Sequence, residues 1–208
     1  MLADYQRLML SSRHRDIDAI AGQATTEGVE SDIAHAFSRA QFSLAAELLG
    51  WIHAQAPVFF EELVIDVLLA MGYGGRRRDL SRRLGRSGDG GVDGLISMDE
   101  LGLDLIYLQA KLLKPGSAVP VSDVRDFAGS LDAHHASKGI FVATSHFSVA
   151  SVSFCQKISR RVVLVDGTKL IELMIRHNVG VRVHQSYQIK RIDPDYFRPG
   201  PRGDAGAR

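Results

Sequence analysis

The spacing of apolar residues predicts helices in the first third of the chain. Residues 1–22 and roughly 30–55 follow a helical pattern, and in the second stretch apolar side chains recur every three or four positions: Ile33, Phe37, Ala40, Leu44, Leu48 and Ile52. Pro57 fits the first turn of a further helix, which the glycines of 72–75 bring to an end. We therefore expect a helical N-terminal segment, residues 1–56, ahead of a domain that begins at 57.

The rest of the chain alternates between strand and helix patterns. Strands are expected at 92–98 and 103–111, joined by a hairpin turn at 99–102. The pattern then predicts, in order, a helix, a strand, a helix, a strand and a helix at 121–135, 139–144, 147–160, 162–165 and 168–177. Such alternation implies parallel strands with helical crossovers. The expected fold class is therefore α/β, with a mixed central sheet flanked by helices.

Composition places the chain among globular proteins and excludes two kinds of cysteine site. Of its 208 residues, 45% are hydrophobic and 24% charged, which is enough apolar material for a sizeable core. The single cysteine, Cys155, excludes an internal disulfide and a multi-cysteine zinc site, and we expect it to pack in the core.

We find no signal-peptide pattern and no run of 18 apolar residues, so we expect a cytoplasmic protein without a membrane partner. Residues 191–208 lack apolar periodicity and are expected to be a disordered tail after a domain at 57–190.

A dense run of arginines precedes the first predicted strand. The net charge is only +1, so any affinity for nucleic acid has to come from local clustering. The stretch "RRRDLSRRLGR" at 76–86 holds six arginines in eleven residues and borders a glycine cluster, "SGDGGVDGLI", at 87–96. Runs of charge are often only a solvated face, but one this dense favours contact with phosphates. The candidate DNA-binding residues are Arg76, Arg77, Arg82, Arg83 and Arg86.

The predicted hairpin brings three polar side chains together. A turn near 99–102 puts Asp93 opposite positions near 107, and strand alternation puts Gln109 and Lys111 on one face. Mg²⁺ prefers oxygen ligands and takes only one or two carboxylates from protein, so Asp93, Gln109 and the backbone carbonyl of Ala110 are candidate ligands. Lys111 could then polarise a water molecule or neutralise charge that grows on a phosphate. The pattern is what metal-dependent phosphodiester cleavage requires.

These residues also resemble a known family. A strand that opens with Asp, a hairpin and a strand that ends in acidic-X-Lys form the signature of the PD-(D/E)XK nucleases. The blocks "GRSGDGGVDGLI", "IYLQAK", "DFAGSLD", "GIFVATSHFS", "LVDGTKL" and "NVGV" together resemble the Mrr-type restriction endonuclease catalytic domain, over about residues 57–183. In that family glutamine commonly replaces the glutamate. The resemblance implies a restriction-endonuclease-like fold in which Asp93, Gln109 and Lys111 are catalytic, with Glu61 of "FFEEL" as a helix glutamate near the metal.

The resemblance implies a metal-dependent DNA endonuclease that uses Mg²⁺ and restricts foreign or modified DNA. Its partner would be double-stranded DNA, and cleavage of both strands needs two active sites, so a homodimer or higher homo-oligomer is expected. Two alternatives stay open: a DNA-binding or regulatory module that does not cut, and a nuclease for branched or damaged DNA. The family usually adds an N-terminal winged-helix domain, but residues 1–56 show no strand pattern, which leaves target recognition open.

Overall fold

The computed structural model describes residues 26–74, 81–83, 91–99 and 101–198. Its helices are α2 Thr26–His53, α3 Pro57–Ala70, α4 Val121–Ala133, α5 Val149–Cys155 and α6 Gly167–Arg176, with a 3-10 helix, η2, at Pro194–Phe197. Its strands are β1 Ser81–Arg83, β2 Gly94–Ser97, β3 Leu105–Lys111, β4 Ala118–Val119, β5 Lys138–Ala143, β6 His146–Phe147 and β7 Arg161–Val165. The helix expected at 1–22 lies outside the described residues.

A five-stranded sheet of mixed direction forms the centre of the fold, with the order β1-β2-β3-β5-β7. The strands β1, β2 and β3 pair antiparallel, as hairpin-connected strands do, whereas β3, β5 and β7 pair parallel. The α/β class with a mixed sheet is therefore confirmed. The edge strand β1 was not predicted, because its three residues lie within the arginine run. The pair β4 and β6 forms a separate two-stranded sheet that was not predicted either.

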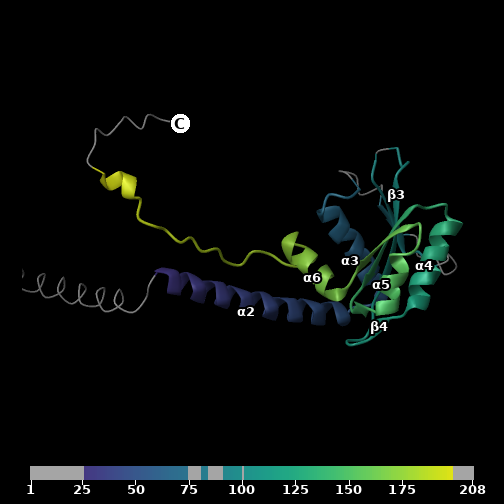
Figure 1. Ribbon diagram of the computed structural model, residues 1–208, viewed down its shortest axis with the longest axis horizontal. Coiled ribbons are helices and arrows are strands. Elements are labelled where there is room, and N and C mark those ends of the chain that lie inside the picture. Colours follow the sequence, from purple (N-terminus) through teal and green to yellow (C-terminus); the bar gives the residue numbers. More distant parts are fainter. Residues whose placement is uncertain (1–25, 75–80, 84–90, 100, 199–208) are drawn as a thin grey trace, which may run out of the picture.

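Helices cover both faces of the sheet (Figure 1). Along β3 the side chains alternate between two buried clusters: Ile106 and Leu108 pack with α3, α6 and the end of α2, whereas Tyr107 packs with α4. We refer to these as the α3 face and the α4 face. Gln109 and Lys111 follow Tyr107 in the alternation, so strand geometry assigns them to the α4 face.

The β2–β3 hairpin confirms the predicted pairing with a small shift in register. Gly94 faces Leu108, and Ser97 faces Leu105. The sequence predicted that Asp93 lies opposite a position near 107. When the observed register is continued by one residue, Asp93 lies opposite Gln109. The shift brings the candidate carboxylate closer to the candidate amide than the sequence predicted.

The helix predicted at 147–160 is shorter in the structure. His146 and Phe147 form β6 instead, because their backbone pairs with β4. Ser148 then caps α5 by accepting a hydrogen bond from the backbone amide of Ser151, so the helix begins at Val149. It ends at Cys155, ahead of the turn that leads into β7.

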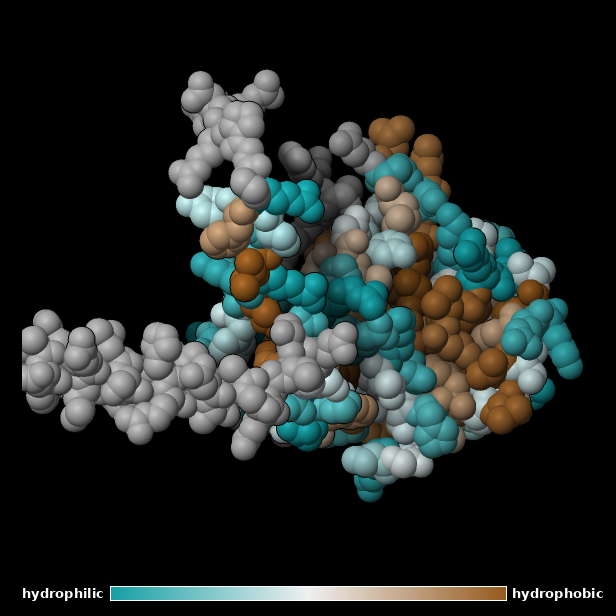
Figure 2. All heavy atoms as spheres, turned by 60° about the vertical axis from the view of Figure 1, so that its left-hand side comes forward, coloured by the Kyte–Doolittle hydropathy of each residue, from teal (hydrophilic) through white to brown (hydrophobic). Residues whose placement is uncertain are grey.

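The helix α2 extends from the domain, and the segment after α6 leaves on the same side (Figure 1). Only the last turns of α2 enter the core, through Leu48 and Ile52, and Arg191 donates a 2.6 Å hydrogen bond to Glu30 across the two segments. Hydrophobic residues also form a brown area on the surface of the domain between hydrophilic regions (Figure 2). Among the described helices, none has the length and hydrophobicity to cross a membrane.

Candidate active site

Asp93 lies at the point where the chain enters β2. Gly91, two residues earlier, has a φ of +83°, a backbone conformation that glycine adopts without steric cost and that turns the chain toward the sheet. The amide of Asp93 donates a 2.8 Å hydrogen bond to the carbonyl of Leu108, which fixes its backbone to β3. One carboxylate oxygen of Asp93, Oδ2, accepts a 2.7 Å hydrogen bond from the backbone amide of Ala110. The structure therefore holds this carboxylate against β3.

The structure brings Gln109 to Asp93, as the hairpin geometry predicted. The amide nitrogen Nε2 of Gln109 donates a 2.8 Å hydrogen bond to the same oxygen, Oδ2 of Asp93. The amide oxygen Oε1 is the end near Gly91, at 3.5 Å from the position that a Cβ would take there. For this oxygen to share a cation with Oδ2 of Asp93, the amide has to turn over and exchange its two ends.

Lys111 is the last residue of β3, and its ammonium group forms an ion pair with Asp123 in the first turn of α4. The side chain of Lys111 is 40% exposed, and that of Asp123 is 22% exposed. Sequence reasoning missed Asp123. The available signal was an acidic residue in the first turn of a predicted helix, but favourable interaction with the helix dipole explains such a residue equally well.

A small pocket of about 160 Å³ joins these groups on the α4 face. It is lined by Gly91, Gln109, Lys111, Asp123, Asp126, Phe127 and Phe141. The pocket lies beside the carboxyl end of β3, where the strand meets the start of α4. Amide, ammonium and carboxylate groups thus share a concave, partly exposed surface, which suits a charged ligand better than an apolar one.

Thr144 fixes the backbone immediately after Lys111. Its amide donates a 3.2 Å hydrogen bond to the carbonyl of Lys111, and its buried hydroxyl both donates to the carbonyl and accepts from the amide of Leu113. A side chain of fixed position needs a fixed backbone beneath it. The end of β5 therefore supports the end of β3 on which the site is built.

The other predicted site residues are placed less directly. Glu61 lies in the second turn of α3, which packs on the α3 face, and it does not line the pocket on the opposite face of the sheet. Its assignment stays a prediction. Arg76, Arg77 and Arg86 lie outside the described residues, whereas Arg82 and Arg83 lie in β1, where Arg83 pairs with Gly94. The backbone of Arg83 therefore lies next to the residue that follows Asp93.

The donor set fits a hard cation that needs few protein ligands. In the described part of the chain, no three His, Cys, Asp or Glu side chains lie together as a metal-binding group. A cation here would rely on the Asp93 carboxylate and on neutral oxygens such as the Gln109 amide and the Ala110 carbonyl. Mg²⁺ binds in this way, because it keeps several waters and completes its shell with substrate phosphates.

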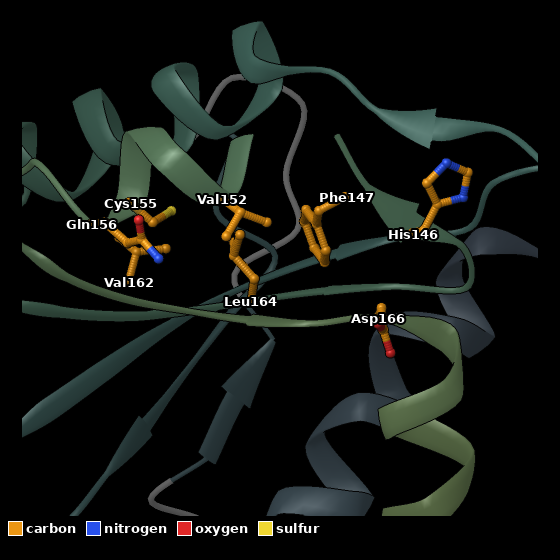
Figure 3. Close-up of a pocket in the computed structure, with 8 residues that line it drawn as sticks. All are labelled: His146, Phe147, Val152, Cys155, Gln156, Val162, Leu164 and Asp166. Atoms are coloured by element: carbon orange, nitrogen blue, oxygen red, sulfur yellow. The ribbon is translucent and has the colours of Figure 1, made fainter. Parts of the chain in front are cut away.

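A larger cavity of about 380 Å³ lies elsewhere, between α5 and β7 (Figure 3). Cys155 and Val162 lie toward one end of it, and His146 and Asp166 toward the other. Cys155 packs against the apolar cluster of the α4 face, as predicted, and burial raises the pKa of its thiol. A raised pKa disfavours the reactive thiolate. Neither Gln109 nor Lys111 lines this cavity, so it does not coincide with the candidate active site.

This chain is similar to known restriction endonucleases. The model of the restriction endonuclease family Mrr_cat matches residues 52–174, a range that includes Asp93, Gln109 and Lys111. The type IV methyl-directed restriction enzyme EcoKMrr of Escherichia coli (strain K12) is 41% identical over 155 residues, which are 74% of this chain and 49% of that protein. The chain thus spans about half the length of this curated relative.

Two solved structures are similar. The DNA modification-dependent restriction endonuclease AspBHI matches with a TM-score of 0.52 and 21% identity over 68% of this chain and 36% of its own, a likeness that shows the fold. The MspJI restriction endonuclease in complex with a 27-mer oligonucleotide matches 68% of this chain and 33% of its own, at 25% identity and a TM-score of 0.46. Only the first likeness supports a statement about architecture.

Proposed function

The chain belongs to the Mrr-type restriction endonuclease family, and from this membership we propose that it is a Mg²⁺-dependent endonuclease that cleaves double-stranded DNA. One observation carries the proposal: the Asp93 carboxylate, the Gln109 amide and the Lys111 ammonium gather at the end of β3, within a chain segment that matches the family. The catalytic domain would comprise residues 57–190, with 1–56 as a helical segment and 191–208 as a tail.

The residues of the site have distinct roles in this proposal. Asp93 would hold the metal ion, together with the amide oxygen of Gln109 and the carbonyl of Ala110. A bound Mg²⁺ would supply Lewis-acid polarisation of the scissile phosphate and a more acidic water molecule. Lys111 would donate hydrogen bonds to the phosphate as negative charge grows on it during attack. Glu61 would contribute only if α3 presents its carboxylate at the strand ends.

We propose that the substrate is foreign or modified DNA. The support is the name of the E. coli relative, which is a methyl-directed restriction enzyme of which this chain spans about half. Cleavage of both strands requires two active sites, so we propose that the protein acts as a homodimer or a higher homo-oligomer. The arginine run, of which β1 forms part beside β2, would bind the phosphates of the duplex.

A plasmid assay tests the proposed activity. Purified protein is incubated with methylated and unmethylated plasmid, with and without Mg²⁺, next to a Lys111→Ala variant that is expected to bind DNA but not to cut it. We expect Mg²⁺-dependent nicking or linearisation, faster on methylated plasmid. DNA binding without cleavage by the parent protein would instead favour a non-cleaving module, and preference for branched over linear DNA would favour a repair role.

A further inference from the structure

We propose that Asp123 is a positioning residue of this site. It holds the ammonium group of Lys111 on the α4 side of the pocket, so that Lys111 does not compete with a metal ion for the carboxylate of Asp93. The consequence for cleavage rests on the proposed function, but the pairing and its effect on metal binding do not. Asp123 would thus act on the reaction through Lys111 rather than by contact with the substrate.

The two partners of the ion pair differ in how firmly they are held. Asp123 lies in the first turn of α4, which is anchored by Val124 and Phe127, both almost fully buried. The side chain of Lys111 is long and flexible, and it is 40% exposed. Because the helix fixes the carboxylate while the lysine can take many rotamers, Asp123 determines where the ammonium group lies.

Charge explains why the lysine needs a partner of its own. Among the proposed metal ligands only Asp93 is charged, so a lysine that paired with this carboxylate would compete directly with the metal ion. In the structure, Oδ2 of Asp93 accepts hydrogen bonds from two neutral donors, whereas the charge of Lys111 is met by Asp123. The pair therefore separates the cationic side chain from the metal-binding carboxylate.

A purely structural role explains the pair less well. Ion pairs with exposed partners contribute little to the stability of a fold, because water screens them. Asp123 and Lys111 both line the pocket that also contains Gln109, so the pair is part of the site rather than of the outer surface. A positioning role predicts that Asp123 matters for metal binding only while Lys111 is present.

Metal binding by the DNA-free protein tests this directly. Mg²⁺ or Mn²⁺ alone is titrated by calorimetry into the parent, Asp123→Ala, Lys111→Ala and the double variant. We expect Asp123→Ala to weaken metal binding at least threefold in the parent background, because the released lysine pairs with Asp93. In the Lys111→Ala background the same change should alter the affinity by less than twofold, because the lysine that would compete for Asp93 is absent. Asp123→Glu, which keeps the charge, should stay near the parent value.

Asp132→Ala is the matched control. It removes the same charge from the same helix, nine residues and about 13 Å along the axis from Asp123, where the side chain pairs with Arg160. Its metal affinity should equal that of the parent. Equal weakening by Asp123→Ala with and without Lys111 would overturn the proposal, because the effect would then be a general loss of negative charge. An unchanged affinity in Asp123→Ala would overturn it as well.

Cleavage kinetics supply the second measurement. At saturating Mg²⁺, Asp123→Ala should lower kcat at least tenfold and change KM for plasmid less than threefold, with recovery in Asp123→Glu, because the lysine is misplaced in the transition state. A kcat within twofold of the parent would overturn the positioning role. If the parent cuts no DNA while the metal titrations behave as expected, the proposed nuclease function fails and the pairing inference stands.

Discussion

The carboxylate of Asp93 and the backbone amide of Ala110 are joined by a 2.7 Å hydrogen bond. The last register pair of the hairpin is Gly94 with Leu108, so the β2 ladder ends before it reaches Ala110. The Asp93 side chain takes the place that a strand carbonyl would occupy beyond that point. The candidate metal ligand therefore also extends the hydrogen bonding between β2 and β3 beyond the end of β2. Removing it affects both the fold and the site.

Asp93→Asn should separate these two roles. A single oxygen, Oδ2, accepts the hydrogen bonds of Gln109 and Ala110, so the one oxygen of asparagine can keep both bonds while the charge is lost. We expect cleavage to fall at least a hundredfold, with the melting temperature close to that of the parent. Asp93→Ala should lose activity too, and about 1 kcal/mol of stability with it. Plasmid nicking and thermal unfolding check this, and an asparagine variant that cuts at the parental rate would show that the site is assigned wrongly.

Gln109→Glu should raise the affinity for Mg²⁺ in the absence of DNA. Glutamate is nearly isosteric but adds a negative charge, and it replaces the donor that Nε2 offers to Asp93 with a second carboxylate. Without metal the two carboxylates repel each other, so the variant should melt at a lower temperature than the parent. Added Mg²⁺ should reverse that loss more strongly than in the parent.

Calorimetry and thermal unfolding across a Mg²⁺ titration measure both effects. If the glutamate variant binds Mg²⁺ no better than the parent, Gln109 does not face the metal. In that case its amide serves only to orient Asp93, as the observed hydrogen bond already does. Activity of this variant is not a useful test, because tighter metal binding and repulsion of the scissile phosphate act in opposite directions.

The sequence predicted local features of the site better than the contacts between distant segments. Hairpin alternation was enough to place Asp93 on the same face as Gln109 and Lys111, because side chains alternate with a period of two. It placed Asp93 opposite a position near 107, whereas the observed register continues to Gln109. The partner of Lys111 could not be predicted in this way, since Asp123 reaches it through the packing of α4 on the sheet. The strand β1 was missed for a similar reason: an arginine-rich segment has no apolar alternation, and its pairing with β2 supplies the strand.

Replacing four arginines should weaken DNA binding and flatten its salt dependence. Arg82 and Arg83 belong to β1, and Arg83 pairs with Gly94 beside Asp93, so a duplex bound at the site would pass close to this strand. Arg76 and Arg77 precede it in the same run. Each phosphate contact that is lost removes the release of counterions from the binding equilibrium. Anisotropy titrations of Arg76, Arg77, Arg82 and Arg83 changed to Gln should show the smaller slope, and an unchanged slope would mean that these arginines only face solvent.

Two glycines near α4 give opposite predictions for the same substitution. A Cβ at Gly139 of β5 would lie 2.8 Å from the ring of Phe127 and 2.9 Å from Leu131, both buried, so Gly139→Ala should cost about 1–3 kcal/mol through overpacking. A Cβ at Gly129, within α4, meets nothing within 4 Å. Gly129→Ala should therefore add up to about 1 kcal/mol, the helix propensity of alanine over glycine. Urea unfolding measures both, and equal effects would contradict the packing of α4 on β5.

The hairpin turn should carry an acid-sensitive part of the stability. The Asp99 carboxylate accepts hydrogen bonds of 2.6, 2.8 and 3.2 Å from the backbone amides of Asp104, Leu101 and Leu103. These amides, that of Asp104 first, lower the pKa of Asp99 in the folded protein. A lowered folded pKa means that the contribution is present above the unfolded pKa, about 4, and is lost as pH falls through the folded value.

Asp99→Asn isolates that contribution from the other carboxylates. Asparagine has one acceptor oxygen where aspartate uses both, so the variant should unfold at a lower urea concentration than the parent near neutral pH. The difference between the two midpoints should shrink as the pH falls below about 4, because protonation removes the charge from the parent's carboxyl group. Urea unfolding of both proteins at stepped pH values provides the measurement. A difference that stays constant down to pH values of about 2 would mean that the shape of the side chain, rather than its charge, holds the turn that sets the register of Asp93 against Gln109.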